Sequence, residues 1–208
     1  MLNGIDVSKY QGNIDWAKVK KSGIDFAIVR LGYTGTKSRR PTLDPKFKRN
    51  LKQCAKFGIN VGVYYYSTAT TIKQAQNEAK FVLKHLKGHK LQYPVYIDSE
   101  DAMQARLTKS ALTSIIKEFC EAIENAGYYV GIYANKYWFA TQLNDSALKA
   151  YDKWVAQYGD KCTYNGDFGM WQYTDRGKID GIKGNVDLNK SKLDYAKIIK
   201  KAKLNGNK

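Results

Sequence analysis

Short apolar runs alternate with helical stripes along most of the chain. Strand-like runs are expected at residues 4–8, 26–31, 61–67, 93–98, 129–134, 153–158, 169–173 and 185–188. Between the early runs, apolar residues recur at three- and four-residue steps over residues 47–55, 72–86 and 112–123, which is the pattern of an amphipathic helix. Glycines stand where helices should end, at Gly23, Gly58, Gly88 and Gly127.

This alternation indicates a parallel α/β sheet, and eight strands favour a closed barrel. The spacing changes late in the chain, because the last three strand starts, at 153, 169 and 185, are only 16 residues apart. That length is too short for a strand, two loops and a crossover helix. We therefore predict an irregular TIM-like barrel of eight strands with about five helices, whose final strands are joined by loops or hairpins.

Length and composition are those of one folded domain. The chain has 208 residues, 43% of them hydrophobic, and none of its apolar runs approaches the roughly 18 residues of a transmembrane helix. Residues 1–6 lack the basic and apolar segments of a secretory signal, so synthesis in the cytoplasm without a signal peptide is expected. Residues 1–190 are interpreted as the barrel domain, and residues 191–208 as a basic helix with a linker-like tail.

The charge is strongly positive, with 35 Lys and Arg against 19 Asp and Glu, a net +16. This favours a polyanionic partner, namely nucleic acid, an anionic membrane or a charged cell-wall polymer, although a basic surface kept for solubility explains it equally well. Cysteines at positions 54, 120 and 162 lack metal-binding spacing and are interpreted as reduced and structural. We expect neither a metal site nor a cofactor.

Carboxylates at strand ends are the candidate chemistry. Asp98 and Glu100 are two residues apart after an apolar run, so both side chains project from one face of an extended strand. Such a pair resists double ionisation, which favours one carboxyl as a general acid for glycosidic cleavage. Asp6 and Asp187 end strand-like runs in the same way. A lone Asp-x-Glu more often caps a helix or faces a loop, but four acids at four strand ends favour a site.

Aromatic residues in the same strands are candidates for sugar binding, because sugar rings pack on aromatic faces with a polar edge. The alternative, that a given tyrosine only fills the barrel, is equally probable for any one of them. The candidates are Tyr64, Tyr66, Tyr133, Trp154 and Tyr158.

The sequence resembles glycoside hydrolase family 25. The matching segments run in order from Gly4-Ile5-Asp6-Val7-Ser8 through Tyr96-Ile97-Asp98-Ser99-Glu100 and Trp171-Gln172-Tyr173 to Val186-Asp187-Leu188-Asn189. The resemblance implies an N-acetylmuramidase (lysozyme) of the phage endolysin or bacterial autolysin type. It implies that Glu100 is the general acid, with Asp98, Asp6 and Asp187 completing the acidic site, and Gln172 joins the candidate substrate-binding residues.

Several alternatives for mechanism and function stay open. The mechanism is open between covalent, inverting and substrate-assisted cleavage, of which we favour the last. A glycan-binding barrel without activity, a chitinase-like enzyme and a nucleic-acid binder are the competing functions, the last disfavoured because the acids would repel phosphate. We expect a monomer that acts, once released from the cell, on bacterial peptidoglycan of a Gram-positive wall bearing teichoic acid, without binding nucleic acid or inserting into a membrane.

Overall fold

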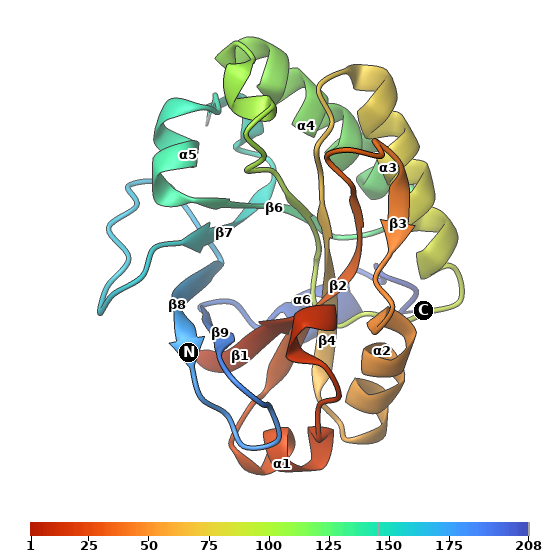
Figure 1. Ribbon diagram of the computed structural model, residues 1–208, viewed down its shortest axis with the longest axis vertical. Coiled ribbons are helices and arrows are strands. Elements are labelled where there is room, and N and C mark those ends of the chain that lie inside the picture. Colours follow the sequence, from red (N-terminus) through yellow and green to blue (C-terminus); the bar gives the residue numbers. More distant parts are fainter. Residues whose placement is uncertain (145, 208) are drawn as a thin grey trace.

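A closed barrel forms the centre of the protein (Figure 1). The structure is a computed structural model that describes residues 1–144 and 146–207. The sheet order is β1-β9-β8-β7-β6-β5-β4-β2, and pairing of β1 with β2 closes it. The barrel strands are β1 (Leu2–Val7), β2 (Phe26–Thr34), β4 (Asn60–Tyr66), β5 (Val95–Asp98), β6 (Val130–Asn135), β7 (Asp152–Ala156), β8 (Met170–Gly177) and β9 (Val186–Ser191). The predicted eight-stranded barrel is therefore confirmed, with β3 (Pro41–Leu43) added as an antiparallel edge strand on β2.

One barrel strand runs opposite to the other seven. Strands β1, β2, β4, β5, β6, β7 and β8 run parallel to their neighbours in this series, whereas β9 is antiparallel to both β8 and β1. The chain between β7 and β8 is a loop without a helix, and a hairpin joins β8 to β9. The expectation of an irregular final third is confirmed, because those connections are too short for crossover helices.

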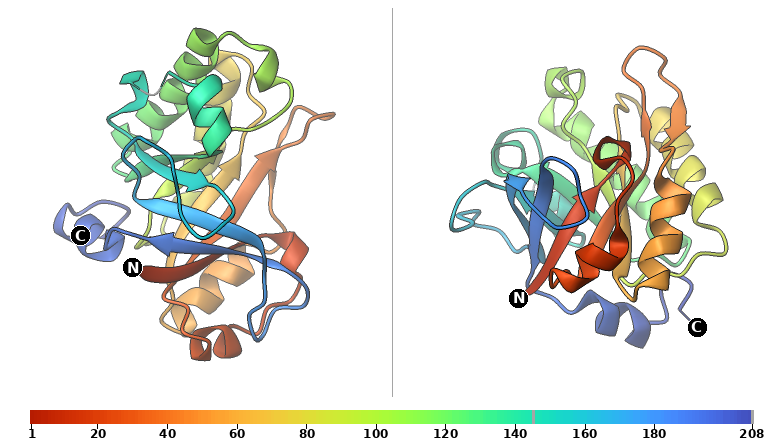
Figure 2. Two further views of the ribbon diagram at one scale, coloured as in Figure 1. Left: turned by 90° about the vertical axis from the view of Figure 1, so that its left-hand side faces the viewer. Right: turned by 60° about the horizontal axis from the view of Figure 1, so that its bottom comes forward.

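Helices pack on part of the outside of the barrel and across one end of it (Figures 1 and 2). They are α1 (Trp16–Lys21), α2 (Phe47–Lys56), α3 (Ile72–Leu86), α4 (Lys109–Asn125), α5 (Lys136–Thr141) and α6 (Tyr195–Lys201). Thr71 and Thr108 begin α3 and α4 by accepting hydrogen bonds from backbone N–H groups of the first turn. The four glycines expected at helix ends all have positive φ. None of the helices in the described part of the chain has the length and apolar character that a membrane crossing requires.

Alternate residues of each strand face two different cores. One set packs with residues of α1 to α5 in an outer core, which includes Val29, Val63 and Ile97. The opposite set forms an inner core within the barrel: Phe26, Ile28, Tyr93, Tyr96, Trp154 and Met170, with Tyr195 and Ile199 of α6. Glycines on the inner rows admit these rings, since a Cβ at Gly4 would lie 2.3 Å from the ring of Phe26. This inner row continues upward into the polar mouth of the barrel.

The C-terminal segment packs across the opposite end of the barrel (Figure 2). Tyr195 and Ile199 are fully buried, and the side chain of Asn205, also fully buried, donates to Tyr93 O and accepts from Tyr129 N. Asn205 and Asn207, which lie in the segment 205–208 that the sequence indicated as a linker-like tail, therefore hold this end of the chain on the barrel, because they satisfy its backbone groups. Lys208 lies outside the described residues, and the division at residue 190 stays a prediction.

Candidate active site

Four carboxyl groups meet at the mouth formed by the carboxyl ends of the parallel strands. Asp98 ends β5, and Glu100 follows two residues later. Asp6 of β1 lies directly opposite Asp187 of β9, at a separation where side chains of paired strands interact. Asp187 stands near the start of its strand and not at the end, which corrects the sequence interpretation. Because β9 is antiparallel, its start nevertheless lies at this mouth.

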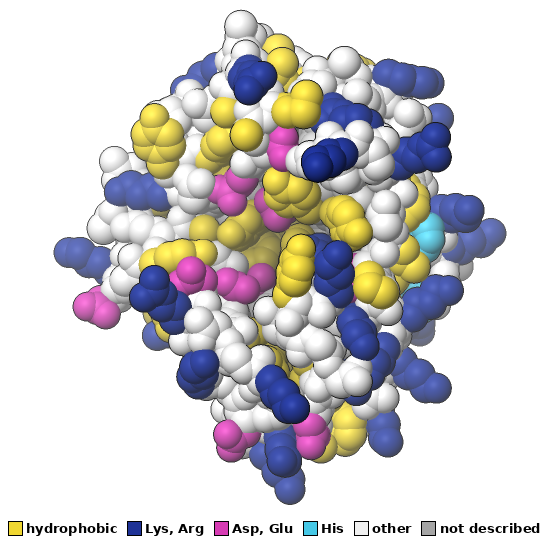
Figure 3. All heavy atoms as spheres, viewed as in Figure 1, with side chains coloured by type: hydrophobic (Ala, Val, Ile, Leu, Met, Phe, Trp, Pro, Cys, Tyr) yellow, Lys and Arg dark blue, Asp and Glu magenta, His cyan; other side chains and the backbone are white. Residues whose placement is uncertain are grey.

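Acidic side chains gather along a hollow in the middle of this face, between patches of apolar side chains (Figure 3). Lys and Arg side chains lie mostly around its periphery. The positive charge of the protein therefore surrounds the hollow, while the hollow itself is acidic. This separation agrees with a neutral or cationic reacting centre, because charge developing there meets carboxylates and not lysines.

Asp98 is a buried acid whose environment favours its protonated form. It is buried, and its Oδ1 has no hydrogen-bond partner. Burial raises the pKa of Asp98 well above its ordinary value, Glu100 and Asp6 raise it further, and Arg30 opposes the rise. A buried carboxyl with an unused oxygen is expected to take up a proton or to accept a donor from a bound molecule.

Glu100 is held by the residue that ends β6. Its Oε1 accepts a hydrogen bond from Asn135 N at 2.6 Å and a second, short one from Asn135 Nδ2. Burial raises the pKa of Glu100, and the two bonds from Asn135 only partly offset that rise. Because Oε1 accepts both donors, Oε2 is the oxygen left to carry an acid proton. The geometry thus provides an oriented carboxylic acid at the strand ends.

Asp6 belongs to a buried polar network. Its Oδ2 accepts from Gln172 Nε2 at 2.9 Å and from Asn189 Nδ2 at 2.8 Å. Burial and then Asp187 raise the pKa of Asp6, against the lowering effect of these two donors. Burial likewise raises the pKa of Asp187. The site therefore retains protons at a pH where isolated carboxyls would have lost them.

Tyr64 and Tyr133 flank the acids, and both rings contact the more deeply buried ring of Trp154. The ring centres of Tyr64 and Trp154 are 6.1 Å apart, and those of Tyr133 and Trp154 are 4.4 Å apart. Trp154 is only 1% exposed, and its Nε1 donates to Asn189 Oδ1. Its predicted role as a sugar-stacking residue is corrected: it is an inner-core residue that positions the two tyrosines.

The other predicted binding residues differ in exposure. Tyr158 is 55% exposed at the rim, whereas Gln172 is 3% exposed and accepts from the hydroxyls of Tyr133 and Tyr158. Gln172 thus links these tyrosines to Asp6, and it is too buried to offer a free amide to a ligand. Tyr66 is half-buried and donates its hydroxyl to Asp101.

Sequence reasoning missed Asn135, Asn189 and Arg30. Each stands two residues after an inward-facing residue of the same strand, namely Tyr133, Asp187 and Ile28. The two-residue period of a strand was the signal that would have found them. No group of three or more His, Cys, Asp or Glu side chains in residues 1–144 and 146–207 is arranged to hold a metal ion.

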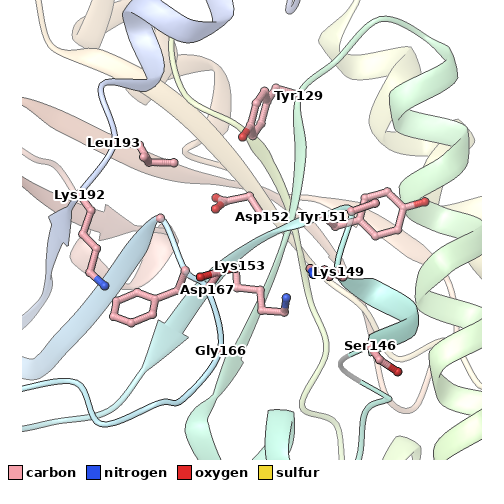
Figure 4. Close-up of a pocket in the computed structure, with 13 residues that line it drawn as sticks. Tyr129, Ser146, Lys149, Tyr151, Asp152, Lys153, Gly166, Asp167, Lys192 and Leu193 are labelled. Carbon is pink, nitrogen blue, oxygen red and sulfur yellow. The ribbon is translucent and has the colours of Figure 1, made fainter.

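A separate cavity, of about 730 Å³, opens near the start of β7 and away from the acids (Figure 4). Its walls include Asp152, Lys149 and Lys192. The Asp152 carboxylate already accepts hydrogen bonds from the hydroxyls of Tyr96 and Tyr195. The buried acid of this cavity is thus committed to holding α6 on the barrel, and the mouth with four acids remains the candidate site.

Comparisons with known proteins agree with this geometry. Residues 5–182 match the family model of glycosyl hydrolases family 25. The chain is 27% identical to the uncharacterized protein YegX of Escherichia coli K12 over 191 residues, which cover 90% of this chain and 68% of that protein. It is also 27% identical to an autolytic lysozyme of Clostridium acetobutylicum, over 90% of this chain and 55% of the relative.

Among solved structures, the modular autolysin LytC of Streptococcus pneumoniae, in complex with a synthetic peptidoglycan ligand, superposes with a TM-score of 0.80 at 29% identity. The match covers 90% of this chain and 46% of that one. This chain therefore spans about half the length of the two named autolytic enzymes.

Proposed function

The chain belongs to glycosyl hydrolases family 25, and we propose on that basis that it is an N-acetylmuramidase, or lysozyme. The reaction is hydrolysis of the β-1,4 bond between N-acetylmuramic acid and N-acetylglucosamine in bacterial peptidoglycan. One observation carries this proposal: two carboxyl groups share one acidic hollow. Glu100 is oriented by its hydrogen bond from Asn135, and Asp98 is buried. The autolytic lysozyme among the relatives supports it.

Glu100 is the general acid of the proposed reaction. Its raised pKa favours the protonated form, and Oε2 delivers that proton to the glycosidic oxygen as the bond to the anomeric carbon breaks. After departure of the leaving sugar, the Glu100 carboxylate takes a proton from the incoming water. One residue therefore acts first as acid and then as base.

Asp98 assists the nucleophile, which we propose to be the 2-acetamido group of the substrate itself. The acetamido carbonyl oxygen bonds to the anomeric carbon, and the unpartnered Oδ1 of Asp98 accepts the acetamido N–H. The bond from the acetamido N–H favours the ionised form of Asp98, and the carboxylate then stabilises the resulting oxazolinium ion, which water opens. Covalent and inverting schemes use a second carboxylate as nucleophile or base. Trapping of a glycosyl adduct on Asp98 or Asp187 by a slow substrate would rule out substrate assistance.

Asp6 and Asp187 maintain the negative potential of the hollow. They lie opposite each other on β1 and β9, so one proton shared between them leaves a net charge that favours an oxocarbenium-like transition state. Tyr64, Tyr133 and Tyr158 supply the walls against which the sugar rings pack.

Two competing functions are tested with the same protein. Purified peptidoglycan incubated with the wild-type protein should release reducing ends, and Glu100→Gln should lower that rate by about 10² to 10⁴ while wall binding persists. A barrel that binds glycan without cleaving it would release none. A chitinase-like enzyme would cleave soluble chitin oligomers at least as well as peptidoglycan. For this protein we expect peptidoglycan to be the better substrate.

The basic exterior supports an anionic wall as partner. A net charge of +16, placed mostly outside the acidic hollow on the face in Figure 3, favours long-range attraction to teichoic acids. We therefore propose that the natural target is a Gram-positive wall and that the protein acts there as a monomer.

A further inference from the structure

A second, cationic hollow adjoins the acidic one. It is a cavity of about 360 Å³ whose walls include Lys9, Tyr10, Arg30, Tyr33 and Tyr66, and we refer to these five residues as the cationic pocket. Register places it beside the acids: Tyr66 of β4 pairs with Asp98 of β5. On β2, Ile28 pairs with Asp6, and Arg30 is the next residue on the same face.

Arg30, which lines this pocket, carries an unsatisfied donor. The residue is only 8% exposed, and its Nε donates to Asp44 Oδ2 at 2.8 Å. Its Nη2, however, is buried without a hydrogen-bond partner. A buried guanidinium N–H without an acceptor costs free energy, so this position favours an incoming anion. The planar fork of arginine suits a carboxylate in particular.

Lys9 adds a second cation, and both cations lie near the rings of Tyr10 and Tyr33. Lys9 Nζ lies 5.3 Å from the ring centres of Tyr10 and of Tyr33. The Arg30 guanidinium lies 5.0 Å and 5.2 Å from the same two rings. Asp44 fixes this arrangement, because its Oδ2 also accepts the backbone N–H of Lys9 at 3.0 Å. Two cations held against two shared rings repel each other, and an anion between them removes that repulsion.

We propose that the cationic pocket binds a carboxylate carried by the 3-O-lactyl substituent of muramic acid and so selects that sugar over N-acetylglucosamine. The inference rests on the proposed muramidase function and extends it to specificity. N-acetylglucosamine has a plain hydroxyl at this position, so chitin offers the pocket no anion. The carboxylate is that of the lactyl group in peptide-free glycan, or one further along the attached peptide in intact wall.

The test compares three glycan oligomers of equal length. The first is peptide-free with free lactyl carboxylates, the second has those carboxylates converted to methylamides, and the third retains its peptides. Binding is measured by calorimetry in a Glu100→Gln background, and kcat/KM is measured in the wild-type background. Lys9→Met removes one cation from the pocket. Lys46→Met is the matched control, because Lys46 is partly exposed, does not line the pocket, and donates its Nζ to Asn13 Oδ1, so the same charge is lost nearby outside the pocket.

The wild-type protein should prefer the free carboxylate over the methylamide by about tenfold, the size expected of one charge-assisted hydrogen bond. That ratio should fall to near one in Lys9→Met and stay near tenfold in Lys46→Met. If peptide-bearing glycan binds with the affinity of the free acid, a peptide carboxylate is also a ligand of the pocket. If it binds with the lower affinity of the methylamide, the lactyl carboxylate is the only ligand.

Equal binding of the free acid and the methylamide overturns the proposal, and so does an acid-to-methylamide binding ratio that stays near tenfold in Lys9→Met. If the wild-type protein still cleaves these glycans, the muramidase function stands. Absence of reducing ends from all three glycans contradicts the muramidase function instead, and the calorimetric ratio still reports on the pocket. Arg30→Gln is a second variant with the same expected loss of the ratio, and its fold is checked by circular dichroism because Asp44 loses its ion pair.

Discussion

Replacement of Asp98 by asparagine should stabilise the protein at neutral pH while it abolishes activity. Asp98 is buried and its Oδ1 lacks a partner, so the neutral amide loses no hydrogen bond at that atom. Burial, Glu100 and Asp6 hold the pKa of Asp98 well above that of the unfolded chain. A carboxyl with a raised folded-state pKa opposes folding once the pH exceeds its unfolded pKa. The gain from Asp98→Asn should therefore be absent near pH 4 and grow towards pH 7.

The size of this effect follows from the proton uptake that folding requires. Each pH unit above an unfolded pKa of about 3.9 is worth about 1.4 kcal/mol, which gives a ceiling of about 4 kcal/mol at pH 7. Burial of the new amide NH2 group offsets part of this, so we expect a gain of about 1–2 kcal/mol. For a chain of this length that is an increase in Tm of roughly 3–6 °C.

Thermal unfolding followed by circular dichroism at pH 4 and pH 7 measures the gain. Asp101→Asn is the matched control, because Asp101 is also buried but accepts hydrogen bonds from Tyr66 Oη and Met103 N. Its replacement removes an acceptor for the tyrosine hydroxyl and should lower Tm. A lower Tm for Asp98→Asn at pH 7, or an equal gain at both pH values, would refute the assignment of Asp98 as an electrostatically strained acid.

Two further predictions concern the proton donor and the wall. Asn135→Ser keeps a cap for α5 but removes the Nδ2 donor to Glu100. The pKa of Glu100 should therefore rise, and the basic limb of the pH profile of kcat/KM should move to higher pH. An unmoved limb would exclude Glu100 as the titrating acid. Replacement of Lys197, Lys200, Lys201 and Lys203 by glutamine should weaken lysis of intact wall at low salt, because wall attraction is screened over about 8 Å at physiological ionic strength, with cleavage of soluble oligomers unchanged. Lysis indifferent to salt and to these lysines would make the basic surface a solubility feature.

The barrel was predictable because its strands and main helices have strong periodic patterns. Asp98 and Glu100 were identifiable from their two-residue spacing after an apolar strand, and α2 to α4 from their apolar stripes. The short elements β3 and α5 carry too few residues for a period to emerge. The direction of β9 was left open, because the 16-residue spacing indicated loops or hairpins and nothing within Val186–Ser191 marks that strand as antiparallel.

Burial of polar and aromatic residues was the harder part of the site. Tryptophan is a residue type that often binds sugars, but the burial of Trp154 inside the barrel depends on residues of other strands and not on its own strand. The packing of Asn205 was equally invisible, because it satisfies backbone groups at Tyr93 and Tyr129, more than 70 residues away. Sequence patterns thus located the acids, and the same two-residue period reaches Asn135 and Asn189, but the hydrogen bonds that these two residues make with the acids required the fold.

Mass spectrometry of peptidoglycan digested by the wild-type protein tests the central claim most directly. Hydrolysis at the proposed bond leaves N-acetylmuramic acid at every new reducing end, and reduction with borohydride converts it to muramitol derivatives of distinct mass. We predict muramitol-terminated fragments, absent from a parallel digest with Glu100→Gln. Fragments that terminate in reduced N-acetylglucosamine would contradict the muramidase assignment.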